Sequence, residues 1–217
     1  MNKKIFAQLL GYSQNDLDKV TQPYILETFG VEVRRCESLE EYASVIDDAC
    51  LHKYFSKYWH NDMKKWKYSG LALIDEVNSM KPRAVLDVGC GYNEFKGKIQ
   101  NIIGIDPYNK NADLQVGVID YKTDQKFDVI LCLGSVNFGS RDKIIAEVGK
   151  CVNLLSKDGT MFFRVNPGLQ HDKPEAKWIE FFGWNVPFII ELADMFNLNV
   201  LDIRDDTNQR KYFILRK

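Results

Sequence analysis

Four short apolar runs in the second half of the chain constrain its fold more than any other feature. Each has the length of a strand and is rich in β-branched or aromatic residues, and a segment with helical apolar spacing, 141–155, separates the last two. Such runs are typical of strands buried on both faces of a parallel sheet, and strands that alternate with helices form βαβ units. The runs are 84–88, 102–106, 127–133 and 160–165. The sequence therefore predicts an α/β fold.

The end of the chain predicts a different connection. Residues 186–196 have the apolar spacing of a helix, and strand-like segments follow at 199–204 and 211–216, joined by the turn-like stretch 205–208. Two strands with so short a connection pair as an antiparallel hairpin. We therefore expect the mainly parallel sheet to gain an antiparallel edge strand at its end.

The first 80 residues have a helical texture. Ser38 stands three positions before Glu41, which is the pattern of a capping box, and apolar residues then recur at spacings of three and four. A further helix is expected at 69–80, ending before Pro82. The chain thus divides into an N-terminal helical cap or substrate region, 1–80, and a core, 81–217.

Composition excludes several classes of protein. The 217 residues carry a formal net charge of −1, which argues against binding duplex DNA by bulk electrostatics. The five cysteines are odd in number and lack CxxC spacing, so neither a zinc site nor a disulfide framework is expected. No apolar run has the length of a membrane span, and the run 5–10 is too short for a signal peptide. We expect a cytoplasmic protein without a metal.

The turn after the first predicted strand has the strongest functional signal. Two glycines, Gly89 and Gly91, stand two apart, where they allow positive φ and a close approach of a ligand. A dinucleotide fingerprint would need a third glycine at the position of Glu94, so NAD is disfavoured. The strand also contains an acid, Asp87, just before the turn. A carboxylate there suits a cationic ligand, such as an ammonium or a sulfonium, and does not suit a phosphate.

A second acid, Asp106, ends the next predicted strand. A carboxylate at this position can accept hydrogen bonds from both hydroxyls of a ribose, although it can equally act as a helix N-cap. The intervening segment 92–100 has poor helical periodicity. We therefore expect a reduced helix or a loop between the two strands.

Taken in order, these motifs resemble those of class I S-adenosylmethionine-dependent methyltransferases. The segments VLDVGCGYNEF, IIGIDPYN, GVIDYKTDQKFDVILCLGS and LLSKDGTMFFRV carry the resemblance over about residues 82–166, and the closing hairpin extends it. It implies a Rossmann-like, seven-stranded, mainly parallel sheet with an antiparallel C-terminal hairpin. It also implies methyl transfer, with S-adenosylmethionine as the cofactor.

The resemblance implies the roles of particular residues. The first turn would hold the methionine part of the cofactor, Asp106 the ribose, the segment around Asp120 the adenine ring, and the turn after the 127–133 strand the methionine side again. The implied cofactor-binding residues are Asp87, Gly89, Cys90, Gly91, Asp106, Pro107, Ile119, Asp120, Tyr121, Leu133, Gly134 and Ser135.

The sequence departs from the family pattern at two points and lacks the motifs of two nucleic-acid-modifying subclasses. Asn93 replaces a frequent third glycine, and asparagine is the side chain that best tolerates the left-handed region. Gly134 or Ser135 replaces the usual acid of the fourth motif. The Asn/Asp-Pro-Pro-aromatic motif of amino-group DNA and RNA methyltransferases and the Pro-Cys nucleophile of cytosine-carbon enzymes are missing from the corresponding slot.

The methyl acceptor is less constrained. His171, in the loop after the 160–165 strand, is the candidate general base, since ligands of open α/β sheets bind outside the carboxyl ends of strands. It can also be an exposed loop histidine. The basic-aromatic segment 50–68 predicts a helical cap, or a site for single-stranded nucleic acid. A small molecule or polypeptide is the favoured acceptor, RNA is the alternative, and a catalytically silent regulatory module is the third hypothesis.

Overall fold

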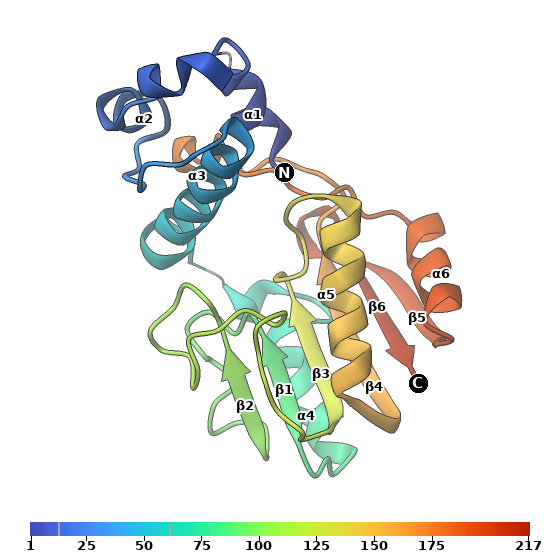
Figure 1. The fold of residues 1–217 in the computed structure, drawn as a ribbon. Helices are drawn as coiled ribbons and strands as arrows, with labels where there is room; N and C mark the ends of the chain where they lie inside the picture. The colour runs from blue at the N-terminus through green and yellow to red at the C-terminus, as the bar shows by residue number, and fades with distance from the viewer. Residues whose placement is uncertain (13, 61) are drawn as a thin grey trace. The chain divides into compact units, whose positions relative to one another are not determined.

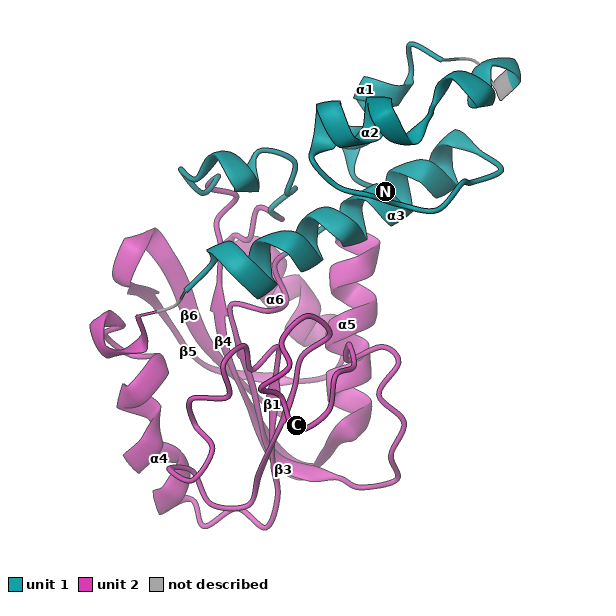
Figure 2. Cartoon of the chain, turned by 90° about the vertical axis from the view of Figure 1, so that its left-hand side faces the viewer, with its two compact units in different colours: residues 1–60, 138–140, 170–181 teal, residues 61–137, 141–169, 182–217 magenta. Residues whose placement is uncertain are grey.

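The computed structural model describes residues 1–12, 14–60 and 62–217. The chain forms two compact units (Figure 2), one of residues 1–60, 138–140 and 170–181 and the other of residues 61–137, 141–169 and 182–217. We call these the helical unit and the sheet unit.

The sheet unit is built on six strands in the order β2-β1-β3-β4-β6-β5 (Figure 1). The first four strands pair in parallel, and β6 pairs antiparallel with both β4 and β5. The strands are β1 (Val85–Val88), β2 (Ile102–Ile105), β3 (Phe127–Leu133), β4 (Leu155–Val165), β5 (Asn199–Asp206) and β6 (Arg210–Arg216).

Helices cover both faces of this sheet because successive strand residues point to opposite sides. Leu86 and Val88 pack with α5 (Arg141–Leu154) and α6 (Val186–Met195), whereas Val85 packs with α4 (Leu73–Ser79). Figure 1 shows α5 in front of the sheet and α4 behind it. The short helices η3 (Met63–Lys65) and η4 (Gly70–Ala72) precede α4, and η6 (Thr207–Gln209) joins β5 to β6. The double coverage explains why β1 and β3 are apolar almost without interruption.

The expected seventh strand is absent from the described residues. Only residues 106–126 separate β2 from β3. A further parallel strand would need two crossovers of about a dozen residues each, and that segment is too short for them. It forms turns and a single parallel bridge between Ile105 and Leu114. The prediction of seven strands is therefore corrected to six.

The C-terminal hairpin is confirmed, with one correction. The antiparallel strand β6 was expected at the edge of the sheet, but it lies between β4 and β5, and β5 is the edge strand. Its sequence explains the position, because Phe213 and Leu215 enter one core cluster and Tyr212 and Ile214 the other. In contrast, β5 exposes Val200 and Leu201.

The helical unit packs around a core of its own. Its helices are α1 (Lys3–Leu9), η1 (Gln14–Lys19), α2 (Gln22–Phe29) and α3 (Leu39–Lys53), followed by the π-helical turn η2 (Tyr54–Tyr58) and, far along the chain, η5 (Pro174–Ala176). The predicted cap of α3 is present, since the Ser38 hydroxyl accepts from the Glu41 N–H at 3.1 Å. The Glu41 carboxylate reaches the N–H of Glu37 rather than that of Ser38, so the capping box is shifted by one residue.

The basic-aromatic segment 50–68 does not form one helical cap. The α-helix ends at Lys53, and the turn η2 is closed by a hydrogen bond of 3.0 Å from the Trp59 N–H to the Tyr54 carbonyl. Further on, Trp66 is buried in the core of the sheet unit, with the Arg164 guanidinium 4.1 Å from its ring centre. The segment is therefore divided between the two units, with residues 50–60 in the helical unit and 61–68 in the sheet unit.

Candidate cofactor site

The turn after β1 is held against the next strand by backbone hydrogen bonds. The N–H groups of Gly89 and Cys90 both donate to the Ile105 carbonyl, at 2.7 and 3.1 Å. Gly89 and Gly91 have φ of 68° and 55°, values that favour glycine. A Cβ on Gly89 would lie 2.3 Å from the Cβ of Ser135, so the turns after β1 and β3 meet at this glycine.

Asn93 takes the left-handed conformation expected of it, with φ of 57°. Its side-chain amide donates to the Asn111 carbonyl at 3.1 Å and to Asp113 at 3.3 Å, while its Oδ1 is buried without a hydrogen-bond partner in the described chain. A Cβ on Gly104 would lie 2.6 Å from that oxygen and 2.8 Å from the Cys90 sulfur. Glycine at 104 therefore lets the first turn pack directly on β2.

Most hydrogen-bond acceptor positions of the Asp106 carboxylate are occupied by backbone N–H groups. One carboxylate oxygen accepts from the N–H groups of Tyr108 and Asn109, at 2.7 and 2.9 Å, and the other accepts from the Gly91 N–H at 3.0 Å. A carboxylate offers about four acceptor positions. No helix begins after Asp106, so the carboxylate closes its own loop and does not act as a helix N-cap. About one acceptor position remains for a ligand.

Asp87 is the unusual group of this region. Its side chain is 3% exposed, and neither a cation nor a hydrogen bond is among the groups that shift its pKa. Burial, together with the charge of Asp106, raises the pKa of Asp87 from its ordinary 3.8 to about 7. A buried carboxylate without a counter-charge is costly, and a cation placed next to it would remove that cost.

The turn after β3 contains a further buried polar atom without a hydrogen-bond partner. The Ser135 hydroxyl is buried and has no hydrogen-bond partner in the described chain. Gly134 has φ of 104°, which only glycine adopts without strain, and Leu133 is buried under the same turn. The residues predicted after β3 thus form one turn, which meets the turn after β1 at Gly89.

The predicted adenine segment is partly exposed and partly buried. Ile119 is 47% exposed and Asp120 is exposed, whereas Tyr121 is buried in the core, with its ring centre 6.5 Å from that of Phe127. Pro107 is exposed as well. Of the predicted trio, Ile119 and Asp120 are the residues whose side chains reach solvent.

His171 belongs to the helical unit, whereas the residues predicted to bind the cofactor belong to the sheet unit. Its Nδ1 lies 2.9 Å from the hydroxyl of Tyr54, a buried residue of the turn η2. Burial, with a contribution from Glu175, raises the pKa of Tyr54 to about 12, so the phenol stays neutral at physiological pH. The predicted base is therefore held by a specific partner and is not a bare loop histidine.

Two groups that sequence reasoning missed shape the loops at this end of the sheet. Asp113 accepts from the Gly104 N–H at 2.8 Å and pairs with Lys96. The Asn166 N–H donates to the Asn137 amide oxygen at 2.8 Å, and the Asn166 amide oxygen accepts from Arg210 at 2.9 Å. Asparagines directly after predicted strands are a usable signal, because their side chains commonly close loop backbones.

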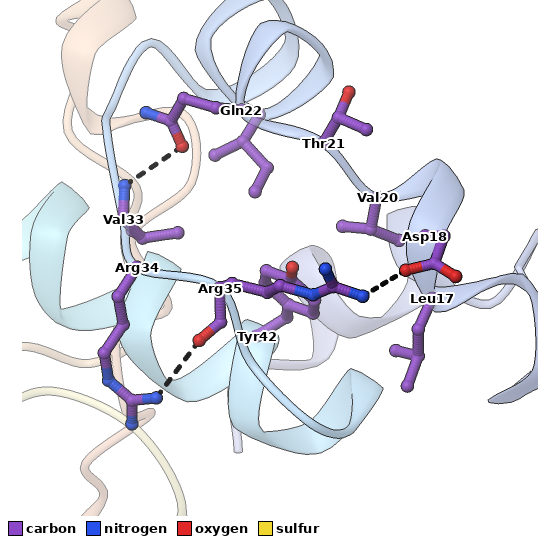
Figure 3. Close-up of a pocket in the computed structure, with 10 residues that line it drawn as sticks. Leu17, Asp18, Val20, Thr21, Gln22, Val33, Arg34, Arg35 and Tyr42 are labelled. Atoms are coloured by element: carbon purple, nitrogen blue, oxygen red, sulfur yellow. Dashed lines mark hydrogen bonds and ion pairs between the residues drawn. The ribbon is translucent and has the colours of Figure 1, made fainter.

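The helical unit contains a separate pocket of about 170 Å³. Figure 3 shows Arg35 paired with Asp18 and the Val33 N–H bonded to the Gln22 side chain, at 3.3 Å. Neither charge of the Arg35–Asp18 pair is withdrawn from water, so the pair adds little stability. None of the residues predicted to act on cofactor or acceptor lines this pocket.

Within the described ranges, no three His, Cys, Asp or Glu side chains gather as they would around a metal ion. No helix of that part of the chain has the length and apolar character that crossing a membrane requires. All five cysteines are unbonded, and the sulfurs of Cys132 and Cys151 lie 3.9 Å apart in the core.

No family model and no curated protein sequence matches this chain, but solved structures match its fold. The 1,6-didemethyltoxoflavin N1-methyltransferase of Burkholderia thailandensis, solved with 1,6-didemethyltoxoflavin and S-adenosylhomocysteine, matches with a TM-score of 0.59 at 16% identity, covering 86% of this chain and 93% of its own. An S-adenosylmethionine-dependent methyltransferase of Clostridium acetobutylicum matches with 0.54 at 16% identity, covering 82% and 98%. The chain has the fold of S-adenosylmethionine-dependent methyltransferases.

A third solved structure of a methyltransferase also matches the fold of this chain. The N-methyltransferase NodS of Bradyrhizobium japonicum, solved with S-adenosylhomocysteine, matches with a TM-score of 0.50 at 11% identity, covering 67% of this chain and 84% of its own. The fold implied by the order of the sequence motifs is thus confirmed, apart from the seventh strand.

Proposed function

We infer that this chain is an S-adenosylmethionine-dependent methyltransferase that acts on a small molecule or a polypeptide. The observation that carries the proposal is the buried carboxylate of Asp87, whose pKa is raised by burial and by Asp106 with no cation to offset it, beside the two-glycine turn after β1. A ligand with a cationic group would restore the missing counter-charge. S-adenosylmethionine carries two such groups, an ammonium and a sulfonium. The fold shared with methyltransferases supports the same ligand.

The residues of the site fit this cofactor at several points. Asp87 would face its cationic end, and the orphaned Ser135 hydroxyl and Asn93 amide oxygen would gain hydrogen-bond partners. The remaining acceptor position of Asp106 would take one ribose hydroxyl, and the exposed side chain of Ile119 would lie against the adenine ring. The sequence resemblance further assigns to cofactor binding Gly89, Cys90, Gly91, Pro107, Asp120, Tyr121, Leu133 and Gly134.

When bound, S-adenosylmethionine supplies a methyl group that is already activated on its sulfonium sulfur. The protein is then required chiefly to position the acceptor and to exclude competing groups. Where the acceptor must lose a proton, we assign that role to His171. With its Nδ1–H donating to the Tyr54 oxygen, the Nε2 lone pair can accept the proton. Tyr54 is a positioning residue in this scheme.

Calorimetry of the full chain tests the cofactor. We expect S-adenosylmethionine and S-adenosylhomocysteine to bind with dissociation constants of about micromolar order, and NAD not to bind. Absence of binding by all three would overturn the proposal. Asp106→Ala is a poor probe, because it would also remove three backbone hydrogen bonds.

The base is tested by turnover, once an acceptor is in hand. We expect His171→Gln to lower kcat about 10²-fold or more, which is the usual contribution of general acid–base catalysis, while the affinity for S-adenosylhomocysteine stays unchanged. His52→Gln, on the exposed side of α3, is the matched control and should leave kcat unaltered. Equal turnover in the two variants would remove His171 from the mechanism.

A further inference from the structure

Five aromatic rings of the helical unit form a closed circuit of contacts. Tyr54 touches Phe55, Phe55 touches Phe138, Phe138 touches Phe181, Phe181 touches His171, and His171 returns to Tyr54. The distances between ring centres, in the same order, are 5.1, 5.1, 5.4, 4.4 and 5.8 Å. We call this circuit the aromatic ring cluster. It joins three chain segments that are far apart in sequence.

The cluster does not behave as hydrophobic core. Tyr54 is buried, but Phe55, Phe138, His171 and Phe181 are all partly exposed, and none of these four belongs to the core of the helical unit. By contrast, Phe29, a core ring of the same unit, is 5% exposed. Rings that stay partly exposed while touching one another leave apolar surface that a flat ligand can cover.

Irregular backbone and polar atoms accompany the cluster. Its first two members lie in the π-helical turn η2, and such turns occur frequently at functional sites. The hydroxyl of Ser56, in the same turn, is buried without a hydrogen-bond partner among the described residues. The contact between His171 and Tyr54 adds a polar pair to the otherwise apolar circuit.

Chain order links the cluster to the chemistry. Phe138 follows the turn after β3, and His171 follows the loop after β4. Ligands of open α/β sheets bind outside the carboxyl ends of the strands, which are the ends from which these loops leave. No acid or base other than His171 and Tyr54 is a member of the circuit, so the cluster favours a neutral ring over an ion.

We propose that the aromatic ring cluster binds the methyl acceptor, and that the acceptor is a neutral, planar aromatic or heteroaromatic molecule with a hydroxyl or ring N–H that hydrogen-bonds to His171. The proposal rests on the proposed function. It adds a substrate class, and it makes Phe138 and Phe181 specificity-determining residues. Each ring that stacks on the acceptor is expected to contribute about a two- to tenfold gain in affinity.

A pair of probes with the same skeleton tests the proposal. With the full chain saturated by S-adenosylhomocysteine, we expect 2-naphthol to bind at least tenfold more tightly than decahydro-2-naphthol, which has the same carbon skeleton and hydroxyl but no flat ring. Phe181→Leu and Phe138→Leu should each weaken 2-naphthol binding two- to tenfold while the affinity for S-adenosylhomocysteine is unchanged. Tyr24→Leu is the control, because Tyr24 pairs with Tyr12 elsewhere in this unit.

The outcomes are distinct. Equal binding of the two probes, or binding of 2-naphthol that neither leucine variant weakens, would overturn the proposal while leaving S-adenosylhomocysteine binding intact. Failure of wild type to bind S-adenosylhomocysteine would instead overturn the proposed function. A single-stranded oligonucleotide that binds more tightly than 2-naphthol, and loses affinity in Phe181→Leu, would replace the small acceptor by a nucleic acid.

Discussion

Replacing Asp87 with asparagine should stabilise the ligand-free protein at neutral and alkaline pH. The pKa of Asp87 is raised from 3.8 to about 7 by burial and by the charge of Asp106, so in the folded state the carboxylate ionises only at a cost. The difference between 3.8 and about 7 corresponds to at most about 4 kcal/mol. Asparagine resembles the protonated acid in shape and avoids this cost.

The sign of the pH dependence follows from the direction of the shift. Below about pH 4 the carboxyl is protonated in both the folded and the unfolded chain, and wild type and Asp87→Asn should be equally stable. As pH rises from about 4 to about 7, the unfolded chain releases a proton that the folded chain retains, and wild type loses stability relative to the variant. Above about pH 7 the difference is complete. For a chain of this size it corresponds to about 10 °C in Tm.

Ligand binding, in contrast to stability, should favour wild type over Asp87→Asn. A cationic ligand favours the ionised carboxylate, so the affinity of wild type for S-adenosylhomocysteine should rise with pH up to about 7 and then level off. Asp87→Asn should bind more weakly and without this dependence. Thermal unfolding and calorimetry at pH 4, 6 and 8 measure both effects. The reasoning is refuted if the variant is no more stable than wild type at pH 8, or if its advantage is as large at pH 4.

Two further predictions concern packing and a buried charge pair. Gly104→Ala should destabilise the protein by about 1–3 kcal/mol in denaturant titrations and weaken S-adenosylhomocysteine binding, because the alanine Cβ would lie 2.6 Å from Asn93 Oδ1. Gly117→Ala is the control: no atom lies within 4 Å of its added Cβ, so stability should change by less than about 1 kcal/mol. Equal losses of stability in the two variants would contradict the steric explanation. Asp206→Asn should lower the free energy of unfolding by about 3–5 kcal/mol, because it leaves the buried Arg164 guanidinium without its counter-charge. Asp205→Asn, at the neighbouring exposed position, should lower it by less than about 1 kcal/mol. Similar losses in the two variants would show that the Arg164–Asp206 pair is not the stabilising contact.

Acidification should weaken the Arg164–Asp206 pair in the wild-type protein and lower its stability. Burial acts to raise the pKa of Asp206, but hydrogen bonds from Ser69 and the Thr207 N–H and the charge of Arg164 together hold it below its ordinary value. The stability that this carboxylate contributes is therefore present above about pH 4 and is lost as pH falls further. Both wild type and Asp87→Asn contain the pair, so it does not disturb their comparison.

Local patterns in the sequence were sufficient to predict most elements of the sheet unit. The apolar runs 84–88 and 127–133 could be assigned as buried strands because residues covered on both faces cannot alternate with polar ones. The cap at Ser38 and the left-handed Asn93 depend on single side chains and their neighbours, and both predictions hold. The seventh strand failed because it came from the resemblance and not from any run of residues.

The sequence by itself determined the order of strands and helices, the glycine turn and the acid that precedes it, because these follow from periodicity and from which residues tolerate positive φ. Only the tertiary structure decided which groups lack partners. The isolation of Asp87 and Ser135, the binding of Asp106 to its own loop and the closed circuit of rings around His171 all depend on segments that meet across long stretches of chain. Burial and pairing are properties of that assembly, and no local pattern specifies them.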